Sequence, residues 1–175
     1  ILNLKGGVLG GSLINGSLSV GDTIEIRPGN IINKNGKVTA NPIRTIVTRI
    51  MSEKSSLDSI RPGGLMAIAT DINPHFTKSD RMVGNIICLP EDDSFVTTSE
   101  LVMKINLLDK KTKLNIKDKV LVQIGPMSME AQVTKYQKKK YTIKFSKPCC
   151  IKKGTVLYLS SNCDRMIIIG SGTYN

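Results

Sequence analysis

The sequence predicts an all-β protein, and three observations favour this fold class. Helical periodicity is hard to find anywhere in the 175 residues. Short segments in which apolar and polar residues alternate are separated by residues typical of turns. A glycine-rich stretch, residues 4–12, stands near the start, and glycine within a strand permits a bend or the close approach of another surface. Together these features predict the short, bent strands of β-barrels.

The expected strands follow one another along the whole chain. Residues 20–29 form a turn and then a strand in which apolar Ile24 and Ile26 alternate with charged residues. Further strands are expected at residues 43–51, 65–70, 82–89, 100–107, 119–124, 129–136, 141–145, 156–160 and 166–169. Residues 30–42 and 52–59 are expected to be loops, because Asn, Lys, Gly and Ser favour turns and solvent.

A break in composition divides the chain into two parts. The acidic and polar sequence PEDDS, residues 90–94, interrupts the apolar strand pattern and is typical of a domain boundary. We therefore expect two packed antiparallel β-barrels, formed by residues 1–90 and residues 91–175.

The charge of the chain points to an acidic partner. Lys and Arg number 25 against 14 Asp and Glu, which gives a formal net charge of +11. A basic surface raises the local concentration of phosphates, so nucleic acid is the leading candidate. No apolar run approaches the ~20 residues of a membrane span. The first residues lack an initiator Met and a targeting pattern, so we expect a piece of a longer protein.

Few residues of this chain could carry catalytic chemistry. The only histidine is His75, and a lone histidine in a loop is usually just solvated. Asp92 and Asp93 lie in the expected linker. The phosphate-binding pattern GxxxxGK followed by Ser or Thr is absent. No CxxC pair occurs, so the cysteines are expected to be buried, reduced thiols: Cys88, Cys149, Cys150 and Cys163. We therefore expect no catalytic residue, no metal site and no cofactor here.

Several blocks of sequence resemble the second domain of translational GTPases, in the same order and spacing. They are the glycine run of residues 4–12, VGDTIEIRPG at 20–29, RPGGL at 61–65 and DRMVG at 80–84. The similarity is greatest to the gamma subunit of eukaryotic and archaeal translation initiation factor 2. Weaker blocks at 119–125, 147–150 and 165–172 extend it over essentially the whole chain, although Ser171 stands where the family usually has Trp.

The resemblance implies a role for the two barrels. Residues 1–90 would be the second-domain barrel, without its first strand, and residues 91–175 the third-domain, C-terminal barrel. The parent would be a cytoplasmic, GTP-dependent carrier that delivers initiator methionyl-tRNA to the small ribosomal subunit, together with alpha and beta subunits. GTP and Mg²⁺ would be held by a domain outside this chain. The barrels themselves would bind tRNA, ribosomal RNA and partner subunits.

The same resemblance implies a tRNA-binding site in the first barrel. In the family, the second domain forms one wall of the cleft that receives the methionylated CCA end of the tRNA. The residues carried over by position are Gly6, Gly7, Gly10, Gly11, Ser12, Arg61, Gly63, Gly64, Leu65, Lys78, Asp80 and Arg81. Lys78 and Arg81 would be phosphate ligands. Alternatively, the glycines only permit barrel curvature, and Asp80 pairs with Arg81 across a turn.

A second candidate surface is a lysine-rich hairpin in the second barrel. Its basic residues are Lys135, Lys138, Lys139, Lys140 and Lys144. Alternation along residues 141–145 places Tyr141, Ile143 and Phe145 inward and leaves Thr142 and Lys144 outward. The hairpin either faces RNA or is a solvated turn.

Two other functions remain open at this point. The barrels could belong to an elongation-factor-like or selenocysteine-specific tRNA carrier. They could also be a protein-interaction scaffold with solvated basic loops. RNA binding that depends on salt would separate the scaffold from the tRNA carriers.

Overall fold

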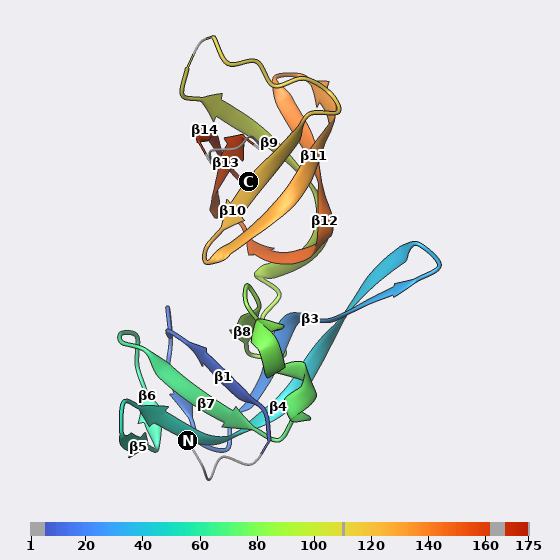
Figure 1. Ribbon diagram of the computed structural model, residues 1–175. Coiled ribbons are helices and arrows are strands. Elements are labelled where there is room, and N and C mark those ends of the chain that lie inside the picture. Colours follow the sequence, from blue (N-terminus) through green and yellow to red (C-terminus); the bar gives the residue numbers. More distant parts are fainter. Residues whose placement is uncertain (1–5, 110, 162–166, 175) are drawn as a thin grey trace.

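A computed structural model describes residues 6–109, 111–161 and 167–174, which form two lobes joined by a short connector (Figure 1). Antiparallel strands make up nearly all of the regular structure in these residues, and the two helical segments are short 3₁₀ turns, Pro74–Phe76 and Lys78–Asp80. The predicted all-β class is confirmed. No helix in the described ranges has the length and apolar character needed to cross a membrane.

The N-terminal lobe is a curled, open antiparallel sheet. Its strand order is β1 (Val8–Gly11), β7 (Met66–Thr70), β4 (Lys37–Ser52), β3 (Thr23–Lys34) and β8 (Ile86–Cys88). Strand β5 (Ser55–Leu57) pairs with the end of β4, and β2 (Leu18–Ser19) pairs with β6 (Ser59–Ile60). A cluster of buried side chains fills the curl: Leu18, Ile24, Val47, Ile50, Ile60, Met66 and Ile68.

The expectation that residues 30–42 form a loop was wrong. They form the outer half of the long β3–β4 hairpin, in which Asn30 lies opposite Asn41 and Lys34 lies opposite Lys37. The turn is Asn35-Gly36, with φ of 51° and 79°. Asn-Gly favours the type I′ turn whose twist matches paired strands, so the same Asn and Gly residues that suggested a loop close a hairpin. The second expected loop, residues 52–59, likewise contains β5 and the start of β6.

The C-terminal lobe is a closed barrel with the strand order β10-β11-β12-β9-β14-β13. The strands are β9 (Phe95–Leu107), β10 (Lys119–Ile124), β11 (Met127–Gln137), β12 (Lys140–Lys152), β13 (Val156–Ser161) and β14 (Ile168–Thr173). Inward residues of β9, β10, β11, β12 and β13 form one apolar core, which includes Val122, Val133, Ile143, Leu157 and Leu159, and the partly buried Ile169 of β14 packs against it. Because the described strands close on themselves, each of them has a neighbour on both sides.

The expected alternation along residues 141–145 was wrong at one position. Ile143 and Phe145 are buried, as predicted, but Thr142 is also buried. The register of β11 against β12 shifts between Val133 and Lys135, so that Thr134 is an extra residue in its strand. Such a bulge interrupts strict in-and-out alternation, and the Thr134 hydroxyl donates to the Thr142 carbonyl (3.2 Å).

Candidate nucleic-acid interface

The predicted glycines fall into two groups with different roles, and the first group serves the fold. The Gly7 N–H donates to the Ile72 carbonyl (2.9 Å), and the Gly7 carbonyl accepts from the N–H and the hydroxyl of Thr70. A Cβ on Gly7 would lie 2.6 Å from the Ile72 side chain, and a Cβ on Gly6 would overlap the Thr70 carbonyl oxygen. Gly6 and Gly7 therefore permit a close approach between two parts of the same lobe.

The second group faces outward. Gly10 and Gly11 are exposed on β1, opposite Ala67 and Met66 of β7. A Cβ on either glycine would meet no described atom within 4 Å, and neither residue has a positive φ. The described fold would accept a larger residue at both positions. The glycines instead leave a strand whose backbone another molecule can approach.

An exposed loop lies at the same end of β1. Residues 61–65 join β6 to β7, and Met66, the next residue, pairs with Gly11. Gly63 and Gly64 have φ of 126° and 67°, which only glycine adopts without strain. Leu65 is 77% exposed. We call Gly10, Gly11, Ser12 and residues 61–65 the glycine edge.

The remaining predicted residues lie at the other end of β1. Lys78, Asp80 and Arg81 belong to the second 3₁₀ turn and its end, and the preceding Thr77 lies beside Gly7. Four residue steps separate Gly7 from Gly11, about 13 Å along an extended strand. The structure therefore places the twelve predicted residues in two groups.

Arg81 has a partner that the sequence did not suggest. Its Nη1 lies 2.5 Å from Nε2 of His75, with a longer contact (3.4 Å) to the His75 carbonyl. A neutral imidazole can accept this bond at Nε2. The expectation that His75 is merely solvated does not include this contact with Arg81. The alternative prediction paired Arg81 with Asp80, whereas in the structure Arg81 pairs with His75.

A groove of about 520 Å³ lies between the two lobes at this point. His75 and Arg81 line it from the N-terminal lobe, and Lys147 lines it from β12. Its apolar lining includes Phe76 and Met127, and none of its lining residues is Asp or Glu. The groove therefore presents positively charged side chains to an anion, and its lining has no carboxylate that would compete with the anion for them.

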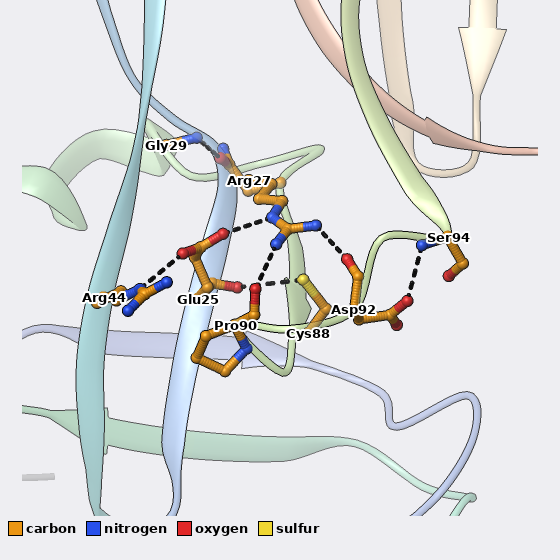
Figure 2. A network of polar contacts seen from close by, with 9 residues as sticks. Glu25, Arg27, Gly29, Arg44, Cys88, Pro90, Asp92 and Ser94 are labelled. Carbon is orange, nitrogen blue, oxygen red and sulfur yellow. Dashed lines mark hydrogen bonds and ion pairs between the residues drawn. The ribbon is translucent and has the colours of Figure 1, made fainter.

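A polar network fixes the connector between the lobes beside this groove (Figure 2). Arg27 lies between the Glu25 carboxylate and the backbone of the connector. Burial raises the pKa of the Glu25 carboxyl, but hydrogen bonds from Arg44 and Arg27 outweigh it, so that the net pKa is lowered. A hydrogen bond from Arg27 to Glu25 raises the pKa of the guanidinium further. This network was not predicted, because Arg44, Pro90 and Asp92 are distant in sequence from Glu25 and Arg27.

The lysine-rich hairpin has a strained tip. Lys138 and Lys139 form the two-residue turn between Gln137 and Lys140, and both have positive φ (50° and 62°). The five predicted lysines are exposed: Lys135, Lys138, Lys139, Lys140 and Lys144. The left-handed conformation costs roughly 1–2 kcal/mol for a residue with a Cβ. Glycine or Asn would form this turn more easily, so the lysines are not explained by the stability of the hairpin.

An exposed aromatic ring accompanies these lysines. Tyr136 lies opposite Tyr141, with ring centroids 4.5 Å apart, and Tyr136 is 53% exposed. Aromatic faces beside lysines are typical of surfaces that bind unpaired nucleotides. Tyr141 was predicted to point inward and Tyr136 was not among the predicted site residues, although tyrosines on both sides of a lysine run are a signal in the sequence.

Known proteins match this chain over nearly its whole length. Residues 96–174 match the family model described as initiation factor eIF2 gamma, C terminal. The chain is 35% identical over 179 residues to translation initiation factor 2 subunit gamma of Archaeoglobus fulgidus, covering 97% of this chain and 41% of the relative. It is 31% identical over 182 residues to the same subunit of Halorubrum lacusprofundi, covering 97% and 44%. The chain thus spans less than half the length of these relatives.

Solved structures support the fold alone. Translation elongation factor SelB of Methanococcus maripaludis, in its apo form, has a TM-score of 0.72 and 18% identity, covering 98% of this chain and 41% of that protein. A bacterial selenocysteine-specific elongation factor has a TM-score of 0.69 and 16% identity, covering 96% and 25%. The sequence relatives are initiation factors, which makes the elongation-factor alternative the weaker one. The chain therefore belongs to the gamma-subunit family of translation initiation factor 2, and its residues 96–174 correspond to the family's C-terminal domain.

Proposed function

We propose that this chain is the RNA-binding part of a protein that delivers initiator methionyl-tRNA to the small ribosomal subunit in a GTP-dependent way. Family membership supports the role in translation initiation. The observation that carries the tRNA-binding role is the open, side-chain-free stretch of β1 at Gly10 and Gly11.

The glycine edge suits the single-stranded 3′ end of a tRNA. Such an end is recognised through its phosphates, its 2′-hydroxyls and the faces of unstacked bases. Two successive residues without side chains let these groups reach the protein backbone, and β1, the end strand of the sheet in the described residues, offers N–H and C=O groups for hydrogen bonds. Arg61 of the adjoining exposed loop supplies a cation, and Leu65 supplies an apolar surface.

The lysine-rich hairpin provides a second RNA contact in this proposal. Its strained Lys138-Lys139 turn supports a functional role, because strain of this kind is typically kept where side chains are needed in a fixed position. Lysine ammonium groups bind phosphates of tRNA or ribosomal RNA with little dependence on sequence. The groove cations Arg81 and Lys147 offer a further place for a phosphate.

We assign no catalytic step to this chain. GTP and Mg²⁺ would be held by another part of the parent protein, since the sequence has no phosphate-binding glycine loop followed by Lys and Ser or Thr. In this proposal the parent acts in the cytoplasm with alpha and beta subunits as partners. A protein-interaction scaffold without RNA binding is the rival function.

Site-directed crosslinking in the full-length factor tests the tRNA proposal. Methionylated initiator tRNA would carry a photoreactive group on its 3′-terminal adenosine, and crosslinked peptides would be identified by mass spectrometry. We expect crosslinks at residues 8–12 and 61–65, reduced when unlabelled methionylated tRNA competes. Efficient tRNA binding with crosslinks only elsewhere would contradict the glycine edge, and no tRNA binding would favour the scaffold.

A further inference from the structure

The outer part of the β3–β4 hairpin, residues 30–41, projects from the N-terminal lobe as a two-stranded ribbon (Figure 1). A bulge at residues 27–29 separates it from the inner hairpin, and Gly29 (φ 76°) is required there because a Cβ would overlap the Asn41 carbonyl oxygen. Strand β8 pairs with residues 25–27 and β7 with residues 47–51, so the described ribbon strands pair only with each other. Residues 33–39 are all exposed.

The two faces of this ribbon differ in chemistry. Residues directly opposite each other share a face, and faces alternate along each strand. One face carries Ile31, Asn33, Val38 and Ala40. The other carries two lysines, two asparagines, a threonine and one isoleucine: Lys34, Lys37, Asn30, Asn41, Thr39 and Ile32. We call this second side the polar face of the ribbon.

The charge of the region is of one sign. Residues 30–41 contain two lysines and no Asp or Glu, whereas the nearby Arg27 and Arg44 are both paired with Glu25. Lys34 and Lys37 lie directly opposite each other beside the turn. Like charges in this position are destabilising, and the favourable Asn35-Gly36 turn does not need them. The facing lysines therefore call for an explanation other than hairpin stability.

We propose that the polar face of the ribbon binds the phosphate backbone of RNA, with Lys34 and Lys37 on either side of one phosphate group. An anion between two facing ammonium groups turns their repulsion into two charge-assisted hydrogen bonds. Thr39 and Asn41, farther along the same face, place a hydroxyl and an amide where sugar hydroxyls or base edges follow the phosphate. The proposal rests on the proposed function only in taking RNA as the partner, because it uses neither the glycine edge nor the lysine-rich hairpin.

A matched pair of double variants tests this contact. Lys34→Ala/Lys37→Ala removes the facing lysines, and Lys54→Ala/Lys153→Ala removes two exposed lysines from other turns, so both lower the net charge of +11 equally. Affinity of the 175-residue chain would be measured at several salt concentrations for a stem-loop RNA of about one helical turn and for an unstructured oligouridine of equal length. The two probes separate duplex from single-stranded binding.

We expect the ribbon variant to weaken binding to one of these RNAs by about tenfold or more. The slope of log K against log salt should fall by about 0.7 to 0.9, because the two lysines together neutralise one phosphate. The control pair should change both quantities much less. Equal effects from both pairs would show that RNA affinity depends on net charge and not on the position of the ribbon lysines, which would overturn the proposal. An unchanged affinity accompanied by aggregation on size-exclusion chromatography would also overturn it. The lysines would then serve only to prevent the exposed strands from pairing with those of another molecule.

The variant Lys37→Glu adds a test of opposite sign. It replaces repulsion with an attractive cross-strand pair, so the melting temperature should stay the same or rise while RNA affinity falls. A fall in both would indicate a purely structural role and overturn the proposal. If Lys138→Ala/Lys139→Ala/Lys140→Ala in the lysine-rich hairpin lowers RNA affinity while Lys34→Ala/Lys37→Ala does not, the ribbon contact fails and the proposed function stands. If the unmodified chain binds neither RNA, the ribbon contact fails, and tRNA crosslinking in the full factor decides the proposed function separately.

Discussion

Arg27 of the N-terminal lobe binds Asp92 of the connector between the lobes: Nη1 of Arg27 donates to the Asp92 carbonyl oxygen at 2.5 Å (Figure 2). Nη2 of the same guanidinium donates to the Pro90 carbonyl (2.9 Å), and Nε donates to the Glu25 carboxylate (2.6 Å). A guanidinium is a planar fork whose donors point in fixed directions. One side chain of β3 therefore fixes the path of the connector, and with it the groove lined from both lobes.

Replacing Arg27 should loosen this connector. In Arg27→Ala both carbonyls lose a charged donor, and the buried Glu25 carboxylate keeps only Arg44, so we expect a loss of about 3 kcal/mol in the free energy of unfolding. Urea denaturation measures this loss, and limited proteolysis should cut residues 89–94 sooner. The matched control is Arg44→Ala, which removes an exposed partner of the same carboxylate and should cost less than about 1 kcal/mol. Equal losses would contradict the special role of Arg27.

The Glu25 carboxylate should make stability depend on acid pH. Burial raises its pKa, but the hydrogen bonds from Arg44 and Arg27 lower it overall, from an ordinary value of 4.5. A carboxyl whose pKa is lowered by folding contributes stability above its unfolded pKa, and that contribution is lost as the pH falls through the folded pKa. We expect the free energy of unfolding to fall below about pH 5.

The variant Glu25→Gln isolates this effect. It should be less stable than the natural chain at neutral pH, and the difference should shrink as the pH falls, because the natural carboxyl becomes protonated too. Exposed Glu130→Gln serves as the control and should follow the natural chain at every pH. A constant difference between Glu25→Gln and the natural chain would show that the carboxylate charge is not the cause.

The two groups of glycines should respond differently to valine. Gly7→Val places a branched side chain against Ile72 and should lower the melting temperature of the chain. Gly10→Val and Gly11→Val meet open space, so the melting temperature should change little while the affinity of the full factor for methionylated tRNA falls. Equal fractional losses of stability and affinity in Gly10→Val would mean that this glycine serves strand curvature alone.

The fold class was predictable because a strand is recognised from the alternation of apolar and polar residues over a few positions. Ile24 and Ile26 show this pattern, and so do Val120, Val122 and Ile124. The ribbon was not predicted, because the Asn, Lys and Gly residues of this stretch suggested a loop. Asn35-Gly36 is also the dipeptide typical of a type I′ hairpin turn, and its positive φ angles show that it forms one. The burial of Thr142 was missed because a bulge on the neighbouring strand, at Thr134, is invisible in the sequence of residues 141–145.

The candidate site was predictable only as a set of motifs. The motif predicted the same role for Gly7 and Gly10. A Cβ on Gly7 would meet Ile72, however, whereas a Cβ on Gly10 would meet no described atom, and this difference depends on what packs against each residue. The contacts of Arg81 with His75 and of Arg27 with the connector depend on side-chain directions. Pairings between residues as distant as Arg27 and Asp92 follow from the tertiary fold rather than from local sequence pattern.

The lysine-rich hairpin allows stability and binding to be separated. Lys138→Asn/Lys139→Gly supplies the residues that its left-handed turn prefers, so we expect the free energy of unfolding to rise by about 1–2 kcal/mol. If the lysines contact phosphates, RNA affinity should fall in this more stable variant. The triple variant Lys138→Ala/Lys139→Ala/Lys140→Ala should weaken RNA binding more, because it removes one further cation.

Salt dependence counts the contacts in these hairpin variants. Each lost phosphate contact should reduce the slope of log K against log salt by roughly 0.7 to 0.9, so the double and triple variants should differ by one such step. Lys153→Ala, an exposed lysine in another turn, is the control for net charge. A variant that gains stability and loses RNA binding cannot be explained by unfolding, which is the usual alternative for a loss of affinity. An unchanged slope and affinity in the triple variant would instead identify the hairpin as a solvated turn.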